Sequence, residues 1–314
     1  MSKKIIAILL ALSFVFAFAA CGGKNDNNSD TTTTTVDPFE AFGEETTNAV
    51  AEDTTAAPAA EDTTAAGAED TTAASQAVDA TTAAASEAAS EATTEAASKM
   101  PQGKEEIVAY FNTAINSAKK DSKSITSNYM KHAVAGEVTG VPSAIDKVLG
   151  GTGNFISGYM GEDESKHNVT WTTAADKNTN FPVENETWAS KLTAADVKDA
   201  QIKESNGKYM IRITTVADGK SADVKHGQGH APKAFNVVMP EVVSNNIPGA
   251  VAKLFKIGTI TMNYPSSTVT VTVDAATGKV LTANYLLYWT INIPLGDGVV
   301  VLPFSTENDY VINW

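Results

Sequence analysis

The first regular pattern of apolar positions begins just after residue 100. Ile107, Phe111, Ile115 and Ala118 recur at intervals of three or four residues, which places them on one side of a helix. Two glutamates lie near the start of this stretch and two lysines close it, an arrangement that the helix dipole favours. The pattern predicts an amphipathic helix over residues 103–120.

Two shorter helical patterns follow the first one. Apolar spacing predicts a helix over residues 125–133 and another over residues 143–149. The second ends at the glycine-rich residues 150–153, because glycine disfavours continuation of a helix. An apolar stripe resumes after this break at residues 155–160.

From about residue 168 the period of the pattern changes to two. Apolar residues alternate with threonine, asparagine and other polar residues, so each strand has one apolar and one polar face. This alternation is typical of an antiparallel sheet with one face in water. Residues 274–279 predict a hairpin loop with Gly278 in the left-handed conformation. Strands are predicted at residues 169–172, 209–214, 260–264, 268–273, 280–293, 299–302 and 310–314.

Two helical segments interrupt these strands. Thr193, with Asp196 three positions later, resembles a helix N-cap ahead of Val197. Residues 242–255 are apolar enough for a helix that covers the sheet, although Pro248 kinks or splits it. These elements predict an α+β domain, a curved antiparallel sheet of six or more strands with N-terminal helices packed on one face.

Composition separates this domain, residues 100–314, from a low-complexity linker at residues 21–99. Of the 78 residues from 22 to 99, 22 are alanine and 17 are threonine, and the string Glu-Asp-Thr-Thr-Ala-Ala occurs three times. Such a segment buries too little apolar area to offset the entropy of ordering, which predicts a disordered tether. Stretched out, it spans roughly 270 Å. The alternative is a stalk whose threonines carry O-linked sugars.

The first 20 residues have the layout of a signal peptide. Lys3 and Lys4 precede an apolar stretch at residues 5–18, which small residues follow. The next residue, Cys21, is the only cysteine of the chain, so neither an intrachain disulfide nor a catalytic thiol of the mature domain is predicted.

The sequence Phe-Ala-Ala-Cys at residues 18–21 resembles the lipobox of bacterial lipoproteins, although Phe18 stands where that family usually has an aliphatic residue. The resemblance implies that a diacylglyceryl group on the Cys21 thiol anchors the protein to the cell membrane, facing the extracytoplasmic side. The alternative is an ordinary signal peptide with an incidental cysteine.

Charge is distributed unevenly along the chain. The formal net charge is −14, and residues 21–99 carry 16 acidic side chains against two lysines. Residues 100–314 carry 21 acidic and 19 basic side chains, so the domain is nearly neutral. The absence of a basic excess argues against nucleic acid as a partner.

The sequence contains no convincing catalytic or metal-binding motif. His226 and His230 have a spacing that grips a metal on a helix, but the glycines between them favour a polar loop. The glycines of residues 150–153 lack the lysine and hydroxyl of a phosphate-binding loop. The acidic residues 162–164 are predicted to be a solvated charge run. No catalytic residue, cofactor or metal is therefore assigned, and an enzyme is not predicted.

The layout of helices followed by a curved sheet resembles the half-barrel of LolA- and LppX-type envelope lipoproteins. The helix at residues 106–116 also resembles the opening helix of uncharacterised clostridial lipoproteins. The half-barrel resemblance implies a non-enzymatic domain that binds a lipid or other apolar ligand between sheet and helices. The alternatives are a solid module that binds a wall polymer or envelope protein through its outer surface, or a hydrolase without a local motif. The residues that would line a cavity, unless they are plain core, are Leu281, Tyr285, Leu287, Trp289 and Ile291.

Overall fold

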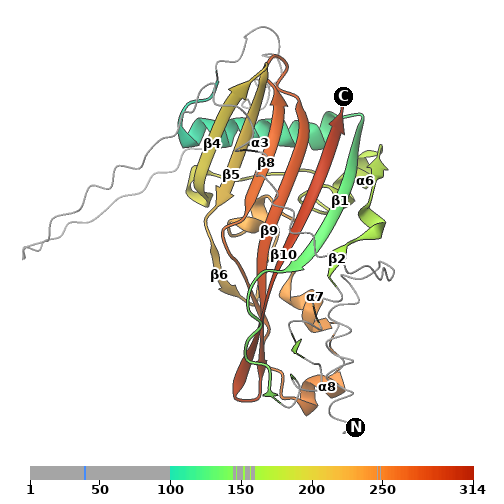
Figure 1. Ribbon diagram of the computed structural model, residues 1–314, viewed down its shortest axis with the longest axis vertical. Coiled ribbons are helices and arrows are strands. Elements are labelled where there is room, and N and C mark those ends of the chain that lie inside the picture. The colour runs from blue at the N-terminus through green and yellow to red at the C-terminus, as the bar shows by residue number, and fades with distance from the viewer. Residues whose placement is uncertain are drawn as a thin grey trace, which may run out of the picture.

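The computed structural model of the protein describes Phe39 and residues 100–314, apart from residues 144–145, 147–150, 153–155, 157–159, 246 and 248. The predicted signal peptide, Cys21 and the rest of the predicted tether lie outside the described residues. So does most of the helix predicted over residues 143–149. The described part is an α+β domain built mainly from one open, curved antiparallel sheet (Figure 1).

The first described helix confirms the prediction to within one residue. Helix α3 spans Gly103–Asp121, with acidic residues in its first turn and lysines in its last. The predicted apolar stripe is its buried side, and Phe111 and Ile115 are fully buried. Figure 1 shows α3 lying across the strands on one face of the sheet. We use inner face for this covered face and outer face for the opposite one.

The sheet contains ten strands in the described part of the chain, and all the strand pairs are antiparallel. The main order is β2-β1-β10-β9-β8-β5-β4, with β3 paired to β1, β7 paired to β9 and β6 paired to β7. The strands are β1 (Ser124–Val134), β2 (Gly161–Glu162), β3 (Val169–Trp171), β4 (Val197–Ser205), β5 (Lys208–Thr215), β6 (Asp218–Ser221), β7 (Thr261–Tyr264), β8 (Thr268–Asp274), β9 (Val280–Leu295) and β10 (Gly298–Asn313).

The strand register defines two rows of side chains across the sheet. An apolar row lies on the inner face, and a more polar row lies on the outer face at the neighbouring positions. The inner row is apolar apart from its final tyrosine hydroxyl, and every member is at most 1% exposed. Its members, paired strand to strand, are Ile202, Ile211, Val271, Ala283 and Tyr310. The neighbouring residues form what we term the outer-face row, which is Gln201, Arg212, Thr270, Asn284, Asp309 and Tyr129.

The helix predicted over residues 125–133 is wrong, because this segment is strand β1. Ile125 and Ser127 are both buried, with the period of two that a strand requires. A register shift between Ser127 and Tyr129 then moves Tyr129 to the outer face, opposite Asp309. This bulge changes the phase of the pattern, so the apolar residues of β1 fall at intervals that imitate a helix.

The helix predicted after Thr193 is also wrong, although its N-cap is present. Thr193 and Asp196 form the reciprocal bonds of a capping box, but the turn they start is only the 3-10 helix η2, Ala194–Asp196. Strand β4 begins at the next residue and was not predicted.

The last two predicted strands are in fact one strand, β10. Its alternation continues through Thr306 and Asn308, which are buried although they are polar. Because these two inward positions are polar, the apolar alternation is interrupted there, and the middle of β10 was not predicted.

The remaining helical elements are short. The helix predicted over residues 242–255 is split, as expected from Pro248, into α7 (Pro240–Asn245) and α8 (Gly249–Leu254). The predicted hairpin loop after Asp274 is confirmed, and Gly278 has φ of 69°. The other elements are η1 (Glu164–Lys166), α6 (Ala174–Asn180) and η3 (Ala231–Lys233).

Candidate functional site

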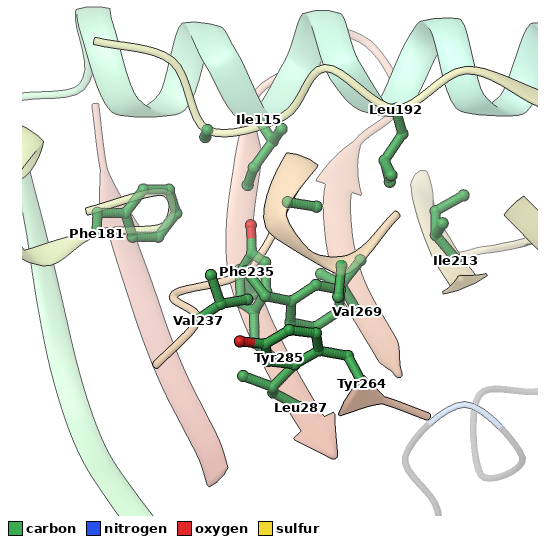
Figure 2. Packing of buried hydrophobic residues seen from close by; sticks show 14 of the residues in the cluster. Ile115, Phe181, Leu192, Ile213, Phe235, Val237, Tyr264, Val269, Tyr285 and Leu287 are labelled. Carbon is green, nitrogen blue, oxygen red and sulfur yellow. The ribbon is translucent and has the colours of Figure 1, made fainter. Parts of the chain in front are cut away.

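The structure places the predicted ligand-lining residues of β9 at different depths. Tyr285, Leu287 and Ile291 are at most 2% exposed, and Leu281 and Trp289 are partly buried. Figure 2 shows Tyr285 and Leu287 inside the buried cluster between the sheet and α3.

Tyr285 packs against aromatic rings of the chain itself. Its ring centroid lies 6.2 Å from that of Phe181, 5.6 Å from that of Phe235 and 6.1 Å from that of Tyr310. All three pairs are close to edge-to-face, an arrangement that aromatic rings prefer. At this level of the inner face, the chain's own side chains therefore surround Tyr285.

The same region contains polar atoms that lack partners. The hydroxyls of Tyr285 and Tyr310 and Oδ1 of Asn308 are buried and make no hydrogen bond to any residue that the structure describes. Asn308 lies directly opposite Tyr285 in the ladder, and Tyr310 follows two positions later. Burial raises the pKa of both hydroxyls, so they are neutral at physiological pH. Leaving such a group unsatisfied costs about 1–3 kcal/mol.

Trp289 is held in place by its neighbours on β10 and β1. Its Nε1 donates to Oγ1 of Thr306 at 3.0 Å, and its ring centroid lies 4.7 Å from that of Phe304. The same Thr306 oxygen is 3.0 Å from Nδ1 of His132. Burial lowers the pKa of His132, so this ring is neutral at pH 7.

The outer face carries a connected polar network at the centre of the sheet. Oε1 of Glu307 accepts from the Tyr129 hydroxyl at 2.8 Å and from Nδ2 of Asn284 at 3.0 Å. Lys131 places its ammonium 4.1 Å from the centroid of the Tyr129 ring. Asp309, in the next pair along the ladder, accepts from Nδ2 of Asn128 at 2.6 Å. Three strands thus contribute donors, acceptors and an aromatic ring to one surface.

Electrostatics in this outer-face network favour the protonated forms of two groups. Burial, with the hydrogen bond to Glu307, raises the pKa of Tyr129 above its usual value. Partial burial also raises the pKa of Asp309, against hydrogen bonds from Asn128 and Asn284 that lower it. Tyr129 therefore stays a hydrogen-bond donor well above neutral pH.

The two histidines considered as metal ligands face different carboxylates. Nδ1 of His226 lies 3.9 Å from Glu186, whereas Nδ1 of His230 lies 2.9 Å from Oδ1 of Asp196. Lys233 reaches the same Asp196 oxygen at 2.7 Å. Within the described ranges, no group of three or more potential ligands is placed to hold a metal ion.

The pKa of Asp196 reflects these contacts. Burial raises it, but hydrogen bonds from Lys233, Thr193 and His230 outweigh burial and lower the pKa to about 2. The loop that was considered as a metal motif is therefore fastened to the fold by an ion pair.

The acidic residues 162–164 do not converge on a common point. Glu162 contacts His167, and Asp163 accepts a hydrogen bond from the backbone of Ser165 at the start of η1. Of the glycine-rich residues 150–153, only Gly151 and Thr152 are described, and Thr152 donates its N–H to Asp146 at 2.7 Å. These contacts are local, as expected for loops.

Sequence reasoning missed the buried lysines, of which Lys119 is the least exposed. Lys119, in the last turn of α3, is 1% exposed and donates to the carbonyl oxygens of Phe181, Val183 and Trp188 at 3.0, 2.7 and 3.3 Å. Burial lowers its pKa to about 8, although Glu186 and Glu184 raise it. Lys119 fastens the loop after α6 to the helix, which is a structural role.

Comparison with known proteins finds no relative: no family profile, curated protein or solved structure matches the chain. No helix in the described part of the chain is long and apolar enough to cross a membrane. The case for function therefore depends on the residues themselves.

Proposed function

We propose that the chain is a lipoprotein of the cell envelope, anchored to the extracytoplasmic side of the membrane through Cys21. Its domain is a non-enzymatic binding module that recognises its partner with the outer face of the sheet. The observation that supports this choice is the contrast between the two faces. Aromatic rings of the chain surround Tyr285 on the inner face, whereas Tyr129, Asn284 and Glu307 form an ordered polar surface on the outer face.

The chemistry of the outer-face network fits a hydroxyl-rich wall polymer. The amide of Asn284 and the neutral hydroxyl of Tyr129 both donate and accept hydrogen bonds, as sugar hydroxyls do, and the carboxylate of Glu307 accepts them. Tyrosine also combines an apolar ring with a polar hydroxyl end, which suits it to an interface. The nearly neutral charge of residues 100–314 gives no strong field for a polyanion.

This proposal is tested by sedimenting residues 22–314 with purified cell walls of the producing host. We expect Glu307→Gln and Asn284→Ala to weaken binding about tenfold, because each removes part of the network. The matched control is Asp297→Asn, an exposed carboxylate in the β9–β10 turn, which should bind like the wild type. Equal sedimentation of all four proteins would contradict the proposed surface.

A second candidate function is supported by the buried hydroxyls of Tyr285 and Tyr310, which have no hydrogen-bond partner among the described residues. A ligand with an apolar body and a polar end would find both kinds of partner between the sheet and α3. Native mass spectrometry of protein from the producing host is the direct test. A bound lipid that dissociates on denaturation, and of which Tyr285→Phe binds less than the wild type, would favour a carrier. A bare protein mass in repeated preparations would remove this candidate.

The anchor has its own test, which does not involve the domain. Cys21→Ser removes the thiol that would carry the diacylglyceryl group. We expect the variant to leave the membrane fraction and appear in the medium or periplasm. Retention of the variant in the membrane would contradict the lipoprotein proposal.

A further inference from the structure

Phe39 lies in the predicted tether, yet it is packed against the domain. Its side chain is 0% exposed. The ammonium of Lys203 lies 4.4 Å from the ring centroid, and the guanidinium carbon of Arg212 lies 4.3 Å from it. Nζ of Lys203 also donates to the backbone oxygen of Phe39 at 3.1 Å, a contact between residues 164 positions apart.

These contacts lie on the outer face of the sheet. Lys203 of β4 is directly opposite Met210 of β5, and Arg212 is two positions further along β5. The residues between them, Ile202 and Ile211, belong to the buried inner row. Lys203 and Met210 are only 9% and 7% exposed, although alternation makes this the polar side of the sheet. The Phe39 ring therefore packs on a part of the outer face where the side chains are themselves buried.

We infer that Phe39 is the centre of a docking segment, and that Lys203 and Arg212 form a clamp that binds the tether back onto its own domain. Two cations at about 4 Å from an aromatic ring are attracted by its negative faces. The ammonium of Lys203 adds a charge-assisted hydrogen bond to the backbone.

The sequence around Phe39 supports its own chain as the occupant. Phe39 and Phe42 are the only aromatic residues between residues 22 and 99. Asp37 and Glu40 flank Phe39 in the sequence, so the segment is negatively charged, and the surface that Phe39 contacts has two cations. Outside residues 37–45, which also contain Phe42 between Glu40 and Glu44, no part of the Ala- and Thr-rich linker combines an aromatic side chain with nearby acidic residues.

Docking at Phe39 divides the linker into the residues before Phe39, which set the distance between Cys21 and the domain, and the residues after it, which do not. Only 17 residues lie between Cys21 and Phe39, and this stretch spans at most about 60 Å. Residues 40–99 come after the docked position in the chain, so they add nothing to the distance between Cys21 and the domain. The docking does not depend on the proposed function. Only the statement that these 17 residues lead to the membrane rests on the anchor.

The test is paramagnetic broadening in residues 22–314, which contain no cysteine. A nitroxide on Thr34→Cys lies within about 17 Å of chain from Phe39. We expect it to broaden amide signals of β4 and β5 around Lys203 and Arg212, while amides at the β9–β10 turn keep their intensity.

Three variants of the labelled protein make this test specific. Phe39→Ala should lower the docking equilibrium constant about tenfold or more and restore the β4 and β5 signals, because ring and cations lose their contact. Lys203→Met, which keeps an aliphatic side chain, should weaken docking in the same direction. Val78→Ala changes the linker elsewhere and should leave the broadening unchanged. Unchanged signals around Tyr285 show that each variant is folded.

Two results would overturn the inference. The first is a set of β4 and β5 intensities that does not differ between the wild-type segment and Phe39→Ala. The second is equal broadening when spin-labelled protein without nitrogen-15 is mixed with nitrogen-15 protein that has no spin label. That result would place the segment on a second copy instead of its own domain.

Discussion

Replacing Lys119 with methionine should change how the stability of the domain depends on pH. Lys119 is buried against three carbonyl oxygens, and burial lowers its pKa from 10.5 to about 8. Between these two values the unfolded chain binds more protons than the folded chain. The free energy of unfolding therefore rises with pH in this window.

The size of the effect follows from the difference between the two pKa values. One pKa unit corresponds to about 1.4 kcal/mol, so the contribution of Lys119 grows by roughly 2 kcal/mol between pH 8 and pH 10. Methionine fills a similar volume but does not titrate. The stability of the wild type relative to Lys119→Met should therefore increase by that amount across the window.

The measurement is urea unfolding of both proteins at pH 7, 8, 9 and 10, followed by tryptophan fluorescence. Buried tyrosines with raised pKa values destabilise the folded chain only as pH rises past about 10, where unfolded tyrosines ionise. They are present in both proteins and cancel in the difference. Parallel stability curves for the two proteins would refute the lowered pKa of Lys119.

Three further predictions concern single side chains. Tyr285→Phe removes a buried hydroxyl that has no partner among the described residues, and thermal unfolding should show a gain of about 1 kcal/mol; a loss would mean that the hydroxyl is satisfied. Asp196→Asn should remove roughly 2 kcal/mol of stability that is present above pH 4 and lost as pH falls to about 2, because Lys233 and other donors lower the pKa of this carboxyl; acid titration of unfolding checks it, and an unchanged acid limb would contradict it. Gly278→Ala forces a side chain into φ of 69°, and denaturant unfolding should show a loss of about 1 kcal/mol; an unchanged midpoint would show that the loop relaxes.

Elements with a local apolar pattern could be predicted from the sequence. Helix α3 and strands such as β8 each bury one side, so their period is visible in a short window. Strand β4 could not be predicted in this way, because a register shift between Val197 and Asp199 interrupts its alternation, and Ile202 is the only large apolar side chain in the rest of the strand. The bulge at Ser127 and Tyr129 had the same effect on β1, since it shifts the phase that pattern reading depends on.

The candidate sites were less predictable than the fold. Lys119 resembles an ordinary lysine at the end of a helix, and its carbonyl partners lie 62 to 69 residues further along the chain. The outer-face network joins Tyr129 to Glu307, which are 178 positions apart. The only local trace of this network is the spacing of two between Glu307 and Asp309, which puts both carboxylates on one side of a strand.

The position of β10 in the sheet determines when the sheet can be completed during synthesis. This strand follows all the others in the chain, yet it lies between β9 and β1, and Asn313 bonds to Ser124 across 189 positions. At a synthesis rate of about 5–20 residues per second, β10 is made roughly 10–40 s after β1. During that interval β8 can pair with β9, β4 with β5 and β3 with β1, but β1 is not yet joined to β9. The sheet therefore lacks the strand that joins β1 to β9 until β10 has been made.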